Sequence, residues 1–254
     1  MILEAQNITF SYGLKQVIDS VGISLTPGKL TVVIGPNGSG KSTFLNLLGG
    51  FLKPDRGSIT LDGREIKNIS ASERAMKIGV LSQSLPPPLD FSVYERIMTG
   101  RFARLPRLLP PSADDEKFVG CAMDEMGISA MADIPCNQLS GGTYQKVLIA
   151  ALLARECGVM LLDEPVSPLD PASALRVMKL LQQKKKDAAV MVVVHDLILA
   201  GAFADELLLF KEGRVFCSGT PEQVLTKENI SEVYGCEADV IPAVSGPVTV
   251  FRCN

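Results

Sequence analysis

A glycine-rich stretch, GPNGSGKST, fills residues 35–43 and fits the pattern G-x-x-x-x-G-K-[ST]. Glycine permits a curled backbone that points successive N–H groups at phosphate oxygens, and the start of the following helix adds a partial positive charge. In such a loop Lys41 spans the β- and γ-phosphates and Ser42 offers its hydroxyl to Mg²⁺. The stretch therefore predicts a phosphate site that consists of Gly35, Pro36, Asn37, Gly38, Ser39, Gly40, Lys41, Ser42 and Thr43.

A second stretch, VMLLDEP, contains four apolar residues followed by Asp163 and Glu164. The apolar residues predict a buried strand whose end presents the two carboxylates. Asp163 is placed to lie near Mg²⁺, and Glu164, one residue further on, suits a base that polarises water. Strands that end in acidic residues are common and by themselves are more often structural. The phosphate loop earlier in the chain favours the catalytic interpretation.

Three single residues are further candidates. His195 ends the strand AVMVVV, which is predicted to run parallel to the strand before the phosphate loop, so both should end at the same crevice. This placement favours a γ-phosphate contact over an ordinary core or surface histidine. Gln83 follows the strand KIGVLS, and an ordinary surface glutamine is its alternative. Tyr12, in SYG, either stacks on an adenine ring or is an aromatic residue at a strand end.

The stretch LSGGTYQ, residues 139–145, stands before a long apolar run, VLIAALLA. Ser140, Gly141 and Gly142 therefore predict the start of a helix whose backbone amides are open to an anion. A single domain with two anion sites is unexpected, because the phosphate loop already provides one.

Strands alternate with helices along most of the chain, which predicts an α/β fold with a mainly parallel sheet. An antiparallel β region opens the chain, with a hairpin at Asp62-Gly63, and a second hairpin follows the last parallel strand. Prolines interrupt residues 85–116, so residues from about 84 to 138 are interpreted as an inserted helical subdomain. Residues 1–235 are predicted to form the main domain, and residues 236–254 a small β appendage.

Composition excludes several other classes of protein. The formal net charge of −3 offers no broad basic face for nucleic acid. The six cysteines form no C-x-x-C pair and there is one histidine, so no paired metal-ligand spacing is present. The N-terminus has no pattern of a signal peptide, and the longest apolar runs fall far below the ~20 residues of a membrane-spanning helix. Contact with a membrane is therefore expected through a partner.

These motifs, in this order, resemble the ATP-binding subunits of ABC transporters over nearly the whole chain. The resemblance implies the fold of a P-loop ATPase that uses ATP and Mg²⁺. Gln83 would be the Q-loop residue beside Mg²⁺, with Ser42 and Asp163. It also implies a head-to-tail homodimer in which Ser140, Gly141 and Gly142 face the γ-phosphate held by the other subunit. The family's functional positions fall in this sequence on Tyr12, residues 35–43, Gln83, residues 139–145, Asp163, Glu164, Asp170 and His195.

Two positions depart from the family's common pattern. Thr143 stands where Glu or Gln is frequent, and Val166 stands where Thr is frequent. Neither replaces a group to which the resemblance assigns chemistry.

Three segments resemble the subunits that drive iron–siderophore, haem and cobalamin importers: ISASERAMKIGVLSQS, IMTGRFARLP and VLTKENISEVYG. The second resembles a GR-x-P stretch in which the proline is displaced. The implied partners are polytopic membrane permease subunits and, indirectly, a periplasmic or extracellular substrate-binding protein. The implied location is peripheral, on the cytoplasmic face of the membrane. The permease would dock on the stretch after Gln83, where Leu85, Leu89, Phe91 and Val93 alternatively form the core of the subdomain.

Two alternatives remain. Zinc and manganese importer subunits share part of this pattern. Soluble ABC ATPases of translation or DNA repair usually carry two nucleotide domains or a long coiled coil, whereas this chain has one phosphate loop and no heptad run.

Overall fold

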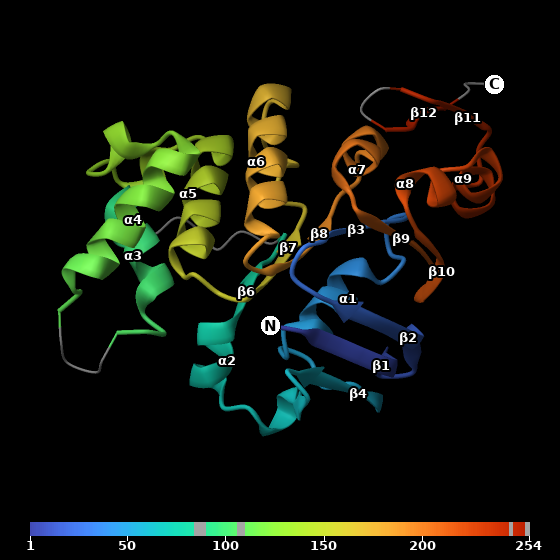
Figure 1. Ribbon diagram of the computed structural model, residues 1–254, viewed down its shortest axis with the longest axis horizontal. Helices are drawn as coiled ribbons and strands as arrows, with labels where there is room; N and C mark the ends of the chain where they lie inside the picture. The colour runs from blue at the N-terminus through green and yellow to red at the C-terminus, as the bar shows by residue number, and fades with distance from the viewer. Residues whose placement is uncertain (84–89, 106–109, 244–245, 252–254) are drawn as a thin grey trace.

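The computed structural model describes residues 1–254 except for 84–89, 106–109, 244–245 and 252–254. The described residues form three sheets, of four, six and two strands. In Figure 1 the N-terminal sheet lies at the bottom, the helices of residues 93–154 lie on the left, and the two-stranded C-terminal sheet lies at the upper right.

The N-terminal sheet is antiparallel, as predicted, and its strand order is β2-β1-β4-β5. Burial alternates along β1 because a half-buried strand points successive side chains to opposite faces. The predicted hairpin at Asp62-Gly63 joins the last two strands, and Asp62 has the positive φ that such turns require. The strands are β1 (Leu3–Tyr12), β2 (Lys15–Leu25), β4 (Arg56–Leu61) and β5 (Arg64–Glu65).

The central sheet has the strand order β10-β9-β3-β8-β7-β6, and the five strands from β9 to β6 are parallel. All residues of β3, β7 and β8 are buried, which explains why these strands are continuous apolar runs. Because the strands are parallel, β3, β7 and β8 end at one edge of the sheet. The strands are β3 (Leu30–Ile34), β6 (Ile78–Leu81), β7 (Val159–Asp163), β8 (Ala189–Val193), β9 (Glu206–Lys211) and β10 (Arg214–Gly219).

Helices and the N-terminal sheet cover the two faces of the central sheet. One apolar cluster joins a face of the sheet to α1 (Lys41–Leu48) and to the N-terminal sheet. A larger cluster joins the other face to α5 (Gly141–Ala154), α6 (Pro171–Lys184) and α7 (Leu197–Phe203). Packing on both faces holds the central sheet in place. The edge at which β3, β7 and β8 end, where the candidate site lies, is therefore fixed as well.

The described part of the segment between β6 and α5 is mainly helical. Its elements are α3 (Val93–Met98), η2 (Thr99–Arg101), α4 (Ala113–Met126), η3 (Ser129–Met131) and η4 (Cys136–Gln138). Two short elements, η1 (Ile66–Asn68) and α2 (Ala71–Lys77), precede β6. The chain ends with α8 (Pro221–Val224), α9 (Lys227–Tyr234), β11 (Ala238–Ile241) and β12 (Val248–Phe251). The proposed domain boundaries stay a prediction.

Across the described part of the chain, every helix is too short or too polar to span a bilayer.

Candidate active site

The predicted phosphate loop connects β3 to α1, and two of its glycines are required by close packing. A Cβ atom on Gly35 would lie 2.4 Å from the carbonyl oxygen of Phe210, and one on Gly40 would lie 2.8 Å from that of Val17. Both glycines have a positive φ, which other residues rarely adopt. The curl of the loop is therefore held between β9 and β2.

Lys41 is the first residue of α1 and is 6% exposed. Its ammonium donates hydrogen bonds to the carbonyl oxygens of Gly35 and Pro36, both at 2.8 Å. Burial lowers the pKa of Lys41, whereas the nearby carboxylates of Glu164 and Asp163 raise it. The loop thus holds a cation close to two acidic groups.

Asp163 ends β7 and is 3% exposed. Burial raises the pKa of this carboxyl group, and the hydroxyl of Ser42 beside it opposes the rise. Its Oδ1 atom has no hydrogen-bond partner among the described residues. A buried oxygen without a partner is costly unless a cation or water satisfies it. Carboxylate and hydroxyl oxygens suit Mg²⁺, which usually takes few protein ligands besides phosphates and water, so Asp163 and Ser42 fit this ion.

Glu164 and His195 form a hydrogen-bonded pair between Oε1 and Nε2. The side chain of Glu164 is 9% exposed and that of His195 is 42% exposed, so the histidine lies nearer to solvent. Glu164 has a φ of 51° and its backbone N–H donates to the carbonyl oxygen of Val193 at 3.0 Å. Strained backbone of this kind persists only where the surrounding structure holds it, and here β8 does so.

A cleft of about 830 Å³ opens at this edge of the central sheet. It brings together nine of the predicted residues: Asn37, Gly38, Gly40, Lys41, Ser42, Thr43, Gln83, Glu164 and His195. Five further residues, which sequence reasoning missed, complete its wall: Lys15, Gln16, Val17, Glu212 and Gly213. They come from β2 and from the β9–β10 turn, and no local motif distinguishes them.

Tyr12 is 53% exposed at the end of β1, and its ring stands edge-on to Phe10 with 4.9 Å between the ring centroids. Among the described residues that line the cleft, Tyr12 is absent, so its predicted contact with adenine stays a prediction.

Ser140, Gly141 and Gly142 begin α5, as predicted, and are likewise absent from the described lining of the cleft. The Ser140 hydroxyl caps the helix by accepting from the Thr143 N–H at 3.3 Å. A Cβ atom on Gly142 would lie 3.0 Å from the carbonyl oxygen of Pro168. The start of α5 therefore packs on the loop that leads to Asp170, which caps α6. Thr143, one of the two departures, bonds the Ser140 hydroxyl through its own at 2.9 Å.

Sequence analysis assigned no individual role to Gln145, within residues 139–145, or to the partly buried Tyr234. Gln145 is 2% exposed and donates from Nε2 to the carbonyl oxygen of Pro165 at 2.9 Å, so it ties α5 to the residue after Glu164. Tyr234, at the end of α9, lies against the backbone amide of Gly35. Burial raises the pKa of Tyr234 to about 12, and the hydrogen bond from Gly35 opposes this rise. No local pattern in the sequence marks either residue.

Comparisons with known proteins agree with this geometry. The sequence matches the family described as "ABC transporter" over residues 18–167. It is 34% identical over 252 residues to the ferric enterobactin transport ATP-binding protein FepC of Escherichia coli (strain K12), which covers 98% of this chain and 93% of FepC. It is also 34% identical over 242 residues to the hemin import ATP-binding protein HmuV of Thermobifida fusca (strain YX), covering 95% of this chain and 84% of HmuV.

Among solved structures, the dimeric bacterial ABC transporter cassette MJ0796 superposes with a TM-score of 0.77 at 27% identity, covering 86% of this chain and 98% of that one. The chain belongs to the ABC transporter family. The predicted fold class is confirmed, and the chain is an ATP-binding ATPase subunit of that family.

Proposed function

We propose that this chain hydrolyses MgATP in its cleft and so powers uptake of an iron–siderophore, haem or cobalamin type compound through a membrane permease. The observation that carries the proposal is similarity along nearly the whole chain to two subunits named for transport of ferric enterobactin and of hemin. The cleft supports it, because a cation and a glutamate–histidine pair line it beside a phosphate loop, and the buried carboxylate of Asp163 lies next to Ser42.

Different residues of the cleft carry out different parts of the transfer of a phosphoryl group to water. The backbone amides of residues 35–43 and the ammonium of Lys41 bind the phosphates, and Glu164 orients the attacking water and accepts its proton. Mg²⁺, held by Ser42, Asp163 and Gln83, would neutralise negative charge on the β- and γ-phosphates. His195 positions Glu164 through the hydrogen bond between the two side chains, and it would contact the γ-phosphate.

The second anion site serves a second copy of this chain. Ser140 and Gly141 are exposed at the start of α5, with no atom within 4 Å of a Cβ built on Gly141. Bare amides at this helix start suit a phosphate that another subunit brings. In a head-to-tail dimer, Ser140, Gly141 and Gly142 would complete the partner's ATP site, with Asp170 nearby at the start of α6.

The remaining partners follow from the same proposal. A permease would hold the subunit peripherally on the cytoplasmic face of the membrane, and a periplasmic or extracellular protein would deliver the substrate to that permease. Substrate choice would rest with those proteins, because the ATPase subunit does not touch the substrate.

Uptake assays test the class of substrate. Deleting the gene should abolish uptake of a labelled ferric siderophore, haem or cobalamin, and a tagged copy of the protein should co-purify with a polytopic membrane protein. Loss of zinc or manganese uptake alone would instead support the first alternative. Co-purification with nucleic acid and with no membrane protein would contradict the transport proposal.

Lys41→Ala should weaken nucleotide binding itself. The substitution removes a charged hydrogen bond to the phosphates, which corresponds to a loss of roughly 10- to 100-fold in affinity. Titration with a fluorescent ATP analogue measures it. Lys29→Ala is the matched control, because Lys29 is exposed and its ammonium lies 3.7 Å from Glu206. Equal affinities of the two variants would remove Lys41 from the phosphate site.

A cysteine at position 91 should cross-link to the permease. Of the four apolar residues predicted to face it, Leu85 and Leu89 lie outside the described residues, and Val93 is 0% exposed, so Val93 belongs to the core. Phe91 remains available at 41% exposed. Phe91→Cys, in a background from which the native cysteines have been removed, should form a cross-link in membranes that contain the permease.

Phe216→Cys is the matched control, since Phe216 is 40% exposed and lies on β10, at the far end of the central sheet from β6. A permease cross-link from position 216 and none from position 91 would overturn the proposed docking face.

A further inference from the structure

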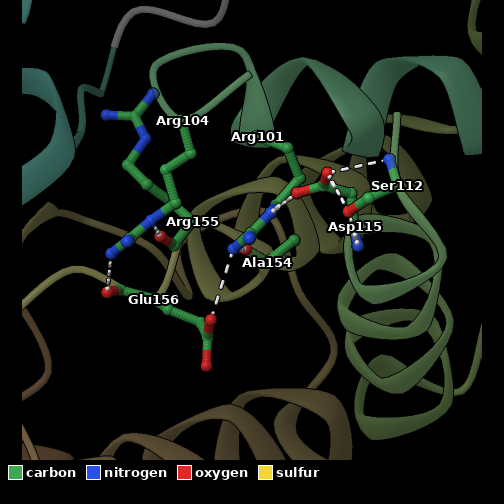
Figure 2. A network of polar contacts seen from close by, with 7 residues as sticks. All are labelled: Arg101, Arg104, Ser112, Asp115, Ala154, Arg155 and Glu156. Carbon is green, nitrogen blue, oxygen red and sulfur yellow. Dashed lines mark hydrogen bonds and ion pairs between the residues drawn. The ribbon is translucent and has the colours of Figure 1, made fainter. Parts of the chain in front are cut away.

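Two arginines that follow α3 bind carbonyl groups at the C-terminal end of α5 and in the two residues after it. Helix ends leave carbonyl oxygens without partners inside the helix. Here Arg101 donates from Nη1 to the carbonyl oxygen of Ala154 at 2.8 Å, and Arg104 donates to those of Arg155 at 2.9 Å and Glu156 at 2.7 Å. Figure 2 shows both guanidinium groups reaching the same end of α5. The positive charges also suit the negative end of the helix dipole.

Arg101 makes three further contacts, one of which is an ion pair at 3.3 Å between its Nη1 and Oε2 of Glu156. It is 5% exposed, and its Nε donates to Oδ1 of Asp115 at 2.8 Å, while its guanidinium lies 4.5 Å from the ring centroid of Phe118. Asp115 accepts hydrogen bonds from Ser112 at the start of α4, and these bonds, with Arg101, lower the pKa of its carboxyl group to about 2. The Asp115 carboxylate is therefore charged at neutral pH, and Arg101 links the start of α4 to the end of α5.

The glycine before Arg101 shows how closely this segment lies on α5. A Cβ atom on Gly100 would lie 2.1 Å from the carbonyl oxygen of Ala151, which no neighbouring atom could accommodate by a small shift. The η2 turn is thus in direct contact with the last turn of α5.

The same stretch of chain also contacts the residues that lead into α5. The backbone N–H of Cys136 donates to the carbonyl oxygen of Phe91 at 2.8 Å, and that of Val93 donates to Ile134 at 3.0 Å. Asn137 also donates to the carboxylate of Asp90 at 2.5 Å. These contacts end three residues before Ser140. Residues 90–104 therefore contact both the approach to α5 and its C-terminal end.

A buried ion pair is weak evidence for stability, because apolar residues of equal volume often stabilise a core as well. Arg101 differs from an apolar residue because its hydrogen bonds are directional. They fix the position of the end of α5. A rigid helix of 14 residues passes such a constraint over about 21 Å to its start, where Ser140 stands.

We propose that Arg101 is a positioning residue for the partner's ATP site: by binding the Ala154 carbonyl and Asp115 together, it aims the amides of Ser140 and Gly141 at the phosphate that the second subunit carries. The inference rests on the proposed function, in which two copies share each ATP. It assigns to Arg101 an effect on the partner's site and none on the P-loop of its own chain.

The test measures two quantities: the dissociation constant of the dimer that forms with ATP, and the affinity of the monomer for ATP. The background is Glu164→Gln, which should accumulate an ATP-bound dimer. Arg101→Met combined with Asp115→Asn leaves no buried charge unpaired and keeps an acceptor for the Ser112 N–H. Sedimentation at saturating MgATP should show a dimer dissociation constant raised roughly tenfold, the loss expected for a charged hydrogen bond. Nucleotide affinity of dilute monomer should stay within about twofold.

Arg56→Leu, at an exposed position of β4, is the control for removing an arginine and should change neither quantity. Arg101→Lys keeps the positive charge but only a single donor nitrogen, and it should show an intermediate dimer dissociation constant. A parallel loss of monomer affinity and dimerisation would show a general structural role and overturn the proposal, as would a dimer constant equal to that of the background. Absence of the ATP dimer in the background variant itself would instead contradict the shared ATP site, and with it both proposals.

Discussion

The Glu164→Gln variant should bind MgATP normally, hydrolyse it very slowly and accumulate an ATP-bound dimer. Gln keeps the shape and the hydrogen-bonding capacity of Glu but loses the charge that orients water and accepts its proton. The rate should fall by about 10²- to 10⁴-fold, the usual contribution of a general base. Single-turnover hydrolysis of labelled ATP measures the rate, and sedimentation measures the dimer.

Glu212→Gln is the matched control. Glu212 lines the same cleft and also has a positive φ, but it lies on the β9–β10 turn, away from the end of β7. Its substitution should leave the rate within a few-fold. Near-normal turnover by the Glu164 variant, or an equal loss in the two variants, would remove Glu164 from the role of base.

The parts of the site that could be predicted from sequence are those in which local pattern determines position. Asp163 and His195 follow apolar runs, and parallel strands end at one edge of the sheet, so their convergence with the phosphate loop follows from chain order. The helix start at Ser140 could be predicted equally well, because its side-chain cap is a local interaction.

The remainder depends on packing between segments that are distant in sequence. Val17 and Gly213 reach the cleft because β2 and the β9–β10 turn both pack on the phosphate loop. The Gly213 N–H of that turn donates to the carbonyl oxygen of Ser39 at 2.9 Å. Arg101 could not be told from a surface arginine, since its burial is set by α4 and α5 together. The interpretation of Val93 was left open for the same reason, and the structure places it in the core.

Two heterodimers with the same pair of substitutions should differ sharply in activity if each ATP lies between Lys41 of one subunit and Ser140 of the other. The first carries Lys41→Ala in one chain and Ser140→Arg in its partner, so both lesions fall on one composite site and the other site is intact. The second carries both lesions in one chain, so each composite site has one. The first should retain basal ATPase and the second should lose most of it, as measured by phosphate release.

The structure makes Ser140→Arg a local lesion. Ser140 is exposed in the single chain, so a long side chain there projects into solvent and disturbs no core packing. The substitution does remove a helix cap, which costs about 1 kcal/mol of stability. Ser70→Arg controls for this cost, because Ser70 is an exposed residue that caps α2 in the same way.

The relative ATPase activities of the two heterodimers show whether the start of α5 contacts the ATP of its own chain or that of its partner. Were Ser140 to contact ATP in its own chain, the dimer with both lesions in one chain would keep an intact site in its wild-type partner and would be the more active of the two. A reference dimer of one Lys41→Ala chain and one wild-type chain measures the activity that one intact site supports. If that reference dimer is active while both doubly substituted dimers match it, the start of α5 contributes nothing at the phosphate. If only the arrangement with both lesions in one chain falls below the reference, then Ser140 acts across the interface, and the second anion site of this chain belongs to its partner's ATP.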